Sequence, residues 1–238
     1  MTWRLLDLFC GAGGAAIGYA RAGFEVVGVD IRPQPHYPFS FYQADALTVL
    51  DTLERGAFDV IHASPPCQEY SQSRYLRAAV HPHVQPVARL IAPLRVQLEA
   101  FGIPWVIENV EGAPLPDALE LCGSMFGLPL RRHRWFACSH LLYAPGPCCH
   151  ARFCINVVGG RVRGYGSLAS AQTYQDAKGT IRKREASLSR TQGCQAMGID
   201  WMTLTELSQA IPPVYTEWIG WQLREILEGL GREGEWRA

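Results

Sequence analysis

Residues 4–14 have the sequence RLLDLFCGAGG, and the class of fold can be inferred from it. The apolar run Arg4–Phe9 predicts a buried β-strand, because the run is short and ends at a cluster of glycines. The small residues of Gly14–Ala22 predict a helix that stops at Gly23. A strand that passes through a glycine-rich turn into a helix is typical of an α/β domain.

Three further buried strands are expected, and helical stretches separate them. One such stretch has leucines at helical spacing from Leu90 to Leu98 and stops at Gly102. Strands that alternate with helices predict a Rossmann-like α/β fold with a mostly parallel, doubly wound sheet. The predicted strands are Glu25–Asp30, Phe58–Ala63 and Trp105–Val110.

The chain is expected to divide into three parts. Residues 1–136 form the α/β domain, 137–190 a short irregular insert, and 191–238 the helices that complete the domain. Regular structure is expected to resume near Thr203, where a Thr-x-x-Glu capping box begins a helix that runs to about Ile211. A closing amphipathic helix follows, and its apolar face consists of Ile219, Leu223, Ile226 and Leu230.

Composition and charge restrict the class of protein. The chain has 238 residues, enough for one sizeable domain with an insert, and none of its apolar runs is long enough for a bilayer. Without a signal or lipidation motif, a membrane or secreted protein is not expected, so the eight cysteines are predicted to be thiols. The net charge is zero, but residues 131–190 contain eleven Lys or Arg and two acidic residues. This imbalance favours a surface that faces a polyanion over a solvated basic loop.

The glycine turn and two carboxylates suggest a nucleoside-containing ligand. Gly11-x-Gly13-x-x-Ala16 lets the backbone approach a ligand at a helix N-terminus, although a plain tight turn is the alternative. Asp30 ends the next strand, where a carboxylate can accept hydrogen bonds from ribose hydroxyls. Asp45 is a candidate for an exocyclic adenine amine, with a helix cap as an equally good interpretation.

Three more polar groups follow predicted strands or lie on an extended segment. Cys67 lies in the stiff sequence Ser-Pro-Pro-Cys-Gln at the end of a strand, where ligands of open α/β sheets bind, which favours a nucleophile over a buried thiol. Glu108, followed by Asn109, is a candidate general acid rather than a strand-end pair satisfied by backbone. Arg132 and Arg134 share one face of an extended segment and suit an anion or a carbonyl oxygen, with a solvated basic strand as the alternative.

Taken in order, FCGAGG, ADAL, PPCQ, IENV and RRHR make the chain resemble the C5-cytosine-specific DNA methyltransferases, in their compact phage-type form. The resemblance implies the S-adenosylmethionine-dependent methyltransferase fold, with residues 137–190 as a small target-recognition region. It implies double-stranded DNA as substrate and S-adenosylmethionine as cofactor. The cofactor-binding residues that it implies are Phe9, Gly11, Ala12, Gly13, Gly14, Asp30, Ile31, Asp45, Ala46, Pro65 and Gln209.

The resemblance also implies catalytic roles. Cys67 would attack C6 of a flipped-out cytosine, and Glu108 would donate a proton to N3. Asn109 would position Glu108 or the base, and Arg134 with Arg132 would bind the base O2 and a nearby phosphate. The loop residues Pro66, Gln68 and Ser71 would contact the substrate.

Two positions depart from the family pattern. Leu130 stands where the family usually has Gln, and Ser208–Pro213 replaces a Gly-Asn pair that touches the cofactor, so the role of Gln209 is open. The rival hypotheses are a tRNA cytosine-C5 methyltransferase and a non-catalytic DNA-binding relative, although the presence of both Cys67 and Glu108 argues against the latter. A monomer in the cytoplasm of a bacterial host, associated with DNA, is expected. A cognate restriction nuclease is a candidate partner, and the sequence does not decide whether one exists.

Several Cys and His residues gather in the insert. A structural zinc site is one interpretation, because a small loop-rich segment has little core of its own. The spacing lacks a Cys-x-x-Cys pair, so plain packing is favoured and no metal is assigned. The residues concerned are Cys138, His140, Cys148, Cys149, His150 and Cys154.

Overall fold

A seven-stranded sheet forms the centre of the molecule. The computed structural model describes residues 2–70, 89–150, 154–165, 173–175, 181–183 and 186–235. In chain order the strands of this sheet are β1 (Trp3–Leu8), β2 (Phe24–Asp30), β3 (Ser40–Gln43), β4 (Val60–Ala63), β5 (Trp105–Asn109), β6 (Leu119–Leu121) and β7 (Arg134–Cys138). Their order across the sheet is β3-β2-β1-β4-β5-β7-β6. The first five are parallel, and β7 runs antiparallel to both β5 and β6. The predicted Rossmann-like α/β class is therefore confirmed.

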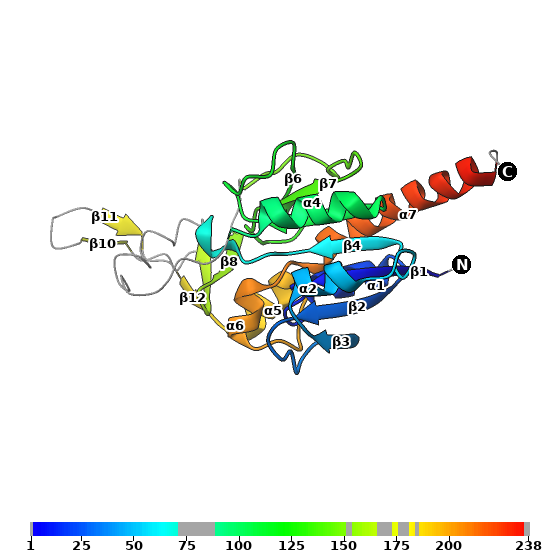
Figure 1. Cartoon of the computed structure of the whole chain (residues 1–238). Helices are drawn as coiled ribbons and strands as arrows, with labels where there is room; N and C mark the ends of the chain where they lie inside the picture. The colour runs from blue at the N-terminus through cyan, green and yellow to red at the C-terminus, as the bar shows by residue number, and fades with distance from the viewer. Residues whose placement is uncertain are drawn as a thin grey trace.

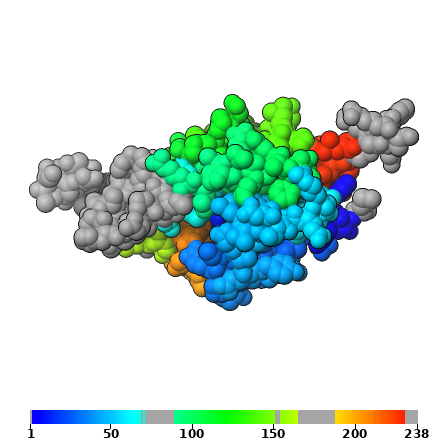
Figure 2. All heavy atoms as spheres, viewed as in Figure 1, coloured from blue at the N-terminus to red at the C-terminus, as the bar shows by residue number. Residues whose placement is uncertain are grey.

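Helices cover both faces of the sheet (Figure 1). One face packs against α1 (Gly14–Arg21) and α7 (Pro213–Glu235), and the other against α2 (Ala46–Thr52) and α4 (Ile91–Phe101). A hydrogen bond of 2.7 Å from Gln97 on α4 to Asp51 on α2 joins the latter pair, whose atoms meet on the surface in Figure 2. None of the helices described is long and apolar enough to cross a membrane.

The close packing of α1 on α7 depends on small residues. A Cβ at Gly18 would lie 2.0 Å from the Thr216 hydroxyl oxygen and 2.1 Å from the Pro213 carbonyl oxygen, so only glycine fits there. The Thr216 hydroxyl donates to the Ala15 carbonyl over 2.8 Å. The closing helix is thereby fixed beside the glycine turn that precedes α1.

The insert contributes small antiparallel sheets. β8 (Cys154–Val158), β9 (Arg161–Tyr165) and β12 (Ala186–Leu188) form one sheet, and β10 (Thr173–Gln175) pairs with β11 (Ile181–Lys183). The three-stranded sheet lies at the end of the molecule away from the C-terminus of α7 (Figure 1). It shares an apolar core with α5 (Arg190–Met197) and α6 (Leu204–Gln209). The boundary expected at residue 136 falls within β7, and the division into domains stays a prediction.

Two expectations about the C-terminal part were wrong. Regular structure resumes at α5 rather than near Thr203, because Ser189 and Gln192 form a capping box of their own. On α7, Leu230 is 45% exposed, whereas Leu227 is 7% exposed and continues the buried face one turn after Leu223. The capped helix that begins after Thr203 is confirmed as α6.

Candidate active site

The glycine turn joins β1 to α1 through left-handed backbone. Phe9, Gly11 and Gly13 have φ values of 57°, 49° and 85°. A Cβ at Gly13 would lie 2.6 Å from a Pro38 ring carbon, whereas a Cβ at Gly11 would meet no atom within 4 Å. The positive φ values therefore favour glycine at positions 11 and 13. The space beside Gly11 is open.

Asp30 holds this turn from the end of β2. Its Oδ2 accepts from the Gly11 N–H over 3.1 Å, and its Oδ1 accepts from the Arg32 N–H over 2.9 Å. Each carboxylate oxygen can accept a further hydrogen bond, so the group can also bind a hydroxyl. The next side chain, Ile31, is 63% exposed and offers an apolar surface beside the carboxylate.

Asp45 caps α2. Its Oδ1 accepts three hydrogen bonds, from the N–H groups of Leu47 and Thr48 and from the Thr48 hydroxyl, over 3.0–3.2 Å. Asp45 therefore caps the helix, as one of the two interpretations expected. The three hydrogen bonds described here all go to its Oδ1. Ala46, the first residue of α2, is buried.

The C-terminal part of the chain supports the turn from outside. The Trp201 indole N–H donates to the Ala12 carbonyl over 3.0 Å, and a Cβ at Gly14 would lie 2.5 Å from the Ile211 carbonyl oxygen. Gln209, at the end of α6, is exposed. Sequence analysis missed Trp201, because a tryptophan in an irregular segment carries no signal of its contact.

Cys67 lies on a loop that is tied to the neighbouring strand. It begins the 3-10 helix η1 (Cys67–Glu69), directly after β4 and the two prolines. The Asn109 side-chain amide at the end of β5 donates to the Pro65 carbonyl over 2.9 Å, two residues before the thiol. Pro66 is half-buried and Gln68 exposed, while Ser71 lies outside the described residues.

A buried ion pair lies at the same strand ends. Arg134 Nε is 3.0 Å from Glu108 Oε1, and the two side chains are 15% and 8% exposed. Glu108 is on β5, and Arg134 begins the antiparallel neighbour β7. The Arg134 guanidinium also donates to the His133 carbonyl over 2.7 Å, which fixes its orientation.

A hydrogen-bonded chain reaches Glu108 from the core. Tyr19 Oη lies 2.9 Å from His62 Nδ1, and His62 Nε2 lies 2.8 Å from Ser64 Oγ. The Ser64 hydroxyl also hydrogen-bonds the Glu108 carboxyl group. Burial lowers the pKa of His62 to about 3, so this imidazole is neutral and serves to orient Ser64.

The electrostatics of the site suit an acid and a nucleophile. Burial raises the pKa of Glu108, and the charges of Arg134 and Arg132 oppose the rise. Burial also raises the pKa of the Cys67 thiol, which Arg134 opposes and Glu108 reinforces. Glu108 is therefore easier to protonate than an ordinary carboxyl, and Cys67 is a thiol at rest that must lose its proton to react.

Arg132 lies in a different environment from Arg134. Its guanidinium is buried and donates to the carbonyls of Val157 on β8 and Ser208 on α6, both over 2.8 Å. The Tyr215 hydroxyl donates to the Arg132 carbonyl over 2.7 Å, and burial lowers the pKa of the guanidinium to about 9. These contacts make Arg132 a link between β8 and α6, and contact with a substrate stays a prediction.

Residues 3–113 match the family model of the C-5 cytosine-specific DNA methylases. Over these residues the chain is similar to the C-5 cytosine-specific DNA methylases. The matched segment contains the glycine turn, Asp30, Cys67 and Glu108. Arg134 and the supporting contacts from Trp201 lie beyond it.

Two curated proteins that are similar to this chain are bacterial. The chain is 30% identical over 137 residues to the Type II methyltransferase M.HgiDI of Herpetosiphon aurantiacus, with 52% of this chain and 42% of the relative covered. It is 33% identical over 88 residues to the Type II methyltransferase M1.HphI of Haemophilus parahaemolyticus, with 31% and 23% covered. The chain thus spans less than half the length of either relative.

A solved structure extends the likeness in fold beyond residues 3–113. It is the crystal structure of a prophage-encoded protein of E. coli, described as a candidate DNA modification methyltransferase. The match has a TM-score of 0.62 at 15% identity and covers 95% of this chain and 100% of the other. The fold is therefore shared over nearly the whole chain.

Proposed function

We propose that the protein is a DNA cytosine-C5 methyltransferase that uses S-adenosylmethionine. The observation that carries the proposal is the position of Cys67, which lies on a loop tied through the Asn109–Pro65 hydrogen bond to β5, the strand that bears Glu108, the buried partner of Arg134. A nucleophile and an acid from adjacent strand ends are the two groups that an attack on a cytosine ring requires.

The residues at the glycine turn fit the proposed cofactor. The open face of Gly11, the Asp30 carboxylate and the exposed Ile31 suit a nucleoside that carries ribose hydroxyls and an adenine ring. Bound there, S-adenosylmethionine supplies an electrophilic methyl group. The other residues proposed to hold it are Phe9, Ala12, Gly13, Gly14, Asp45, Ala46, Pro65 and Gln209.

The proposed chemistry follows from the protein side chains. The Cys67 thiol loses its proton, and the thiolate forms a bond to C6 of cytosine while Glu108 gives a proton to N3. Electron density then reaches C5, which becomes the site of methylation. Loss of the C5 proton to a base expels the Cys67 thiolate, and return of the N3 proton to Glu108 restores the aromatic ring.

The remaining groups position the base. Asn109 fixes the loop of Cys67, and Arg134 keeps Glu108 in place and suits the base O2. Pro66, Gln68 and Ser71 are proposed to contact a cytosine that has flipped out of duplex DNA, because C5 and C6 cannot be attacked inside the stack. The proposal includes a monomer in the cytoplasm of a bacterial host, with a cognate restriction nuclease.

The test is a transfer assay with labelled S-adenosylmethionine on mixed-sequence duplex DNA and, in parallel, on total tRNA. The proposal predicts label in DNA as 5-methylcytosine and none in tRNA, and Cys67→Ala should abolish it. Label in tRNA alone would establish the RNA hypothesis instead. Cofactor binding without transfer to either polymer would favour a non-catalytic DNA-binding relative.

A further inference from the structure

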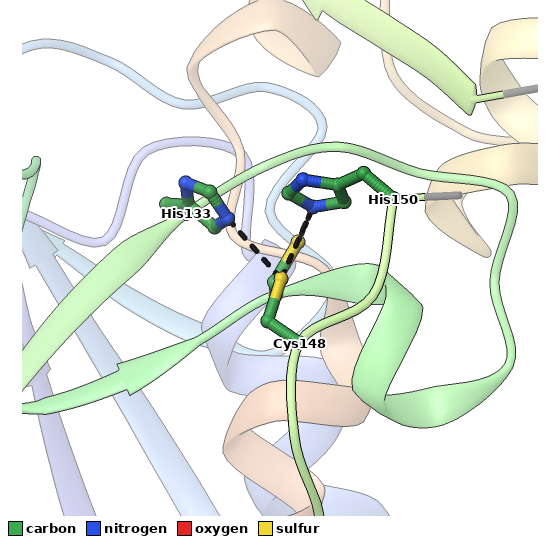
Figure 3. Close-up of side chains that lie close together, drawn as sticks. His133, Cys148 and His150 are labelled. Atoms are coloured by element: carbon green, nitrogen blue, oxygen red, sulfur yellow. Dashed lines mark hydrogen bonds between the residues drawn. The ribbon is translucent and has the colours of Figure 1, made fainter. Parts of the chain in front are cut away.

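Four side chains that the proposed chemistry does not use converge beside β7. Cys122, His133, Cys148 and His150 each offer one ligand atom, and these four atoms all lie within 4.8 Å of one another. We call them the Cys/His cluster. Figure 3 shows His133 and His150 with their rings directed toward the Cys148 sulfur.

The contacts within the Cys/His cluster share atoms. His150 Nε2 lies 3.2 Å from the Cys122 sulfur and 3.1 Å from the Cys148 sulfur. The Cys148 sulfur lies in turn 3.4 Å from His133 Nε2. A ring nitrogen has only one hydrogen or one lone pair to offer, so it cannot bond both sulfurs well. Atoms that approach several others in this way face a common centre rather than form separate pairs.

The distances and donor types match a tetrahedral ion. With Zn–S bonds of about 2.3 Å and Zn–N bonds of about 2.0–2.1 Å, sulfur and nitrogen ligands lie roughly 3.5 Å apart around zinc. Two thiolates with two neutral imidazoles are a donor set that zinc prefers, and the thiolates neutralise its charge. The Ser124 hydroxyl lies 3.3 Å from the Cys148 sulfur, where it can donate to a thiolate.

We propose that Cys122, His133, Cys148 and His150 bind one structural Zn²⁺ ion. Four protein ligands leave no position for a substrate or a water molecule, so the ion would have no part in methyl transfer. It would instead join three segments. These are the start of the 3-10 helix η2 (Gly123–Phe126), the entry to β7, and the end of the irregular loop 139–150.

The location gives the ion a structural role near the active site. His133 lies between Arg132 and Arg134, and its carbonyl accepts a hydrogen bond from Arg134, the partner of Glu108. The loop 139–150 is otherwise fixed to α7, where the Tyr143 carbonyl accepts from the Trp218 indole over 2.7 Å. A metal would close this loop at its other end and hold the strand that presents Arg134.

In the sequence a different set of Cys and His residues had drawn attention, and plain packing was favoured for it over a metal site. Only Cys148 and His150 of the expected set belong to the Cys/His cluster. Cys138 ends β7 and His140 follows it, at the opposite end of the strand from His133, and Cys149 is exposed. Cys122 was not in that set; it is buried and also supplies a ligand atom.

The experiment measures metal content in the whole 238-residue chain, purified without chelators or a metal-affinity tag. Elemental analysis should find about one zinc per chain, which Cys148→Ala and His150→Ala should each remove. Cys149→Ala is the matched control, since it changes an exposed neighbour, and should keep the zinc. A wild-type protein without zinc that also takes up none in titration would overturn the proposal. So would unchanged zinc content in the Cys148→Ala variant.

A second measurement uses only the wild-type protein, so its result does not depend on whether the variants fold. Wild-type protein stripped of zinc and reloaded with Co²⁺ should show the visible absorption and the sulfur-to-metal charge-transfer band of a tetrahedral thiolate site. Absence of these bands, or an octahedral cobalt spectrum, would contradict the assignment. Neither readout involves DNA or S-adenosylmethionine, so a failure of the zinc site is distinguishable from a failure of the proposed methyl transfer.

Discussion

The candidate active site draws its residues from two regions, and these residues reach the site in different ways. In the parallel half, residues 2–113, Asp30, Cys67 and Glu108 lie at or just after the ends of strands, and parallel strand ends meet at one edge of the sheet. In the support region, the described residues from 114 to 235, Arg134 and Trp201 reach the site from an antiparallel strand and a loop. The first arrangement follows from topology, whereas the second depends on individual side-chain contacts. Substitutions in the parallel half should therefore affect chemistry, and many in the support region should affect assembly.

The largest effect is expected at Glu108. Glu108→Gln should lower the single-turnover methylation rate by ~10²–10⁴-fold, because the amide cannot give a proton to N3. Since burial raises the pKa of Glu108, the wild-type rate limited by this acid should fall as pH rises through that pKa, and the variant should lack this dependence. Glu111→Gln changes an exposed residue just past β5 and is the control. A Glu108→Gln variant with a wild-type rate would remove Glu108 from the chemistry.

A second prediction concerns Asp7, a buried carboxyl group in β1 that makes the free energy of unfolding depend on pH. Asp7 is fully buried, its Oδ1 has no hydrogen-bond partner, and burial raises its pKa to about 8. The folded state thus holds a proton that the unfolded state releases at about pH 4, so stability from this group is complete below that pH and declines as pH rises to about 8. In urea unfolding, the free energy of unfolding of Asp7→Asn should fall less with rising pH than that of the wild type, by a few kcal/mol over this pH range. Identical pH profiles for the two proteins would contradict the assignment.

The two arginines separate assembly from chemistry within the support region. Arg132→Met should lower the free energy of unfolding by about 1.5–3 kcal/mol, because two buried carbonyls lose a charged donor. Arg134→Met should mainly slow methylation, because Glu108 loses the partner that holds it in place. Stability should change less, because the unpaired Glu108 can take up a proton and become neutral. Denaturant unfolding and single-turnover rates measured on both variants give the comparison. A wild-type stability for Arg132→Met would show that its carbonyl contacts contribute little.

The smallest of these effects is expected at Asp30. Asp30→Ala should weaken S-adenosylmethionine binding by about 1–3 kcal/mol, because the ribose hydroxyls and the glycine turn lose an acceptor. Titration calorimetry measures the change, and Glu25→Ala, an exposed residue on the same strand, is the control. Unchanged affinity for Asp30→Ala would place the ribose elsewhere.

Sequence patterns predicted most of the parallel half. The strands that end near Phe9, Asp30, Ala63 and Asn109 were predicted from apolar runs, and topology then brings their polar ends together. The pairing of Arg134 with Glu108 could not be predicted in this way, because it depends on β7 entering the sheet antiparallel to β5. The pattern of alternate residues grouped Arg132 with Arg134, yet the buried contacts of Arg132 with β8 and α6 are long-range and leave no local signal.

The Cys/His cluster shows the same limit. Its ligand atoms come from three segments, separated by spacings that match no short zinc motif, and the fold alone brings them together. By contrast, the capping box of Ser189 and Gln192 was visible in the sequence and would have predicted α5. Local signals of this kind can be recovered from sequence, whereas contacts across the sheet cannot.

The most direct test of the central claim is covalent trapping at Cys67. The protein is incubated with S-adenosylmethionine and duplexes of many sequences that carry 5-fluorocytosine, whose fluorine blocks the final elimination. The account predicts a denaturant-stable protein–DNA adduct with the wild type and with Cys149→Ala, and none with Cys67→Ala. An adduct that persists in Cys67→Ala, or none with the wild type although the cofactor binds, would contradict attack by Cys67 on DNA cytosine.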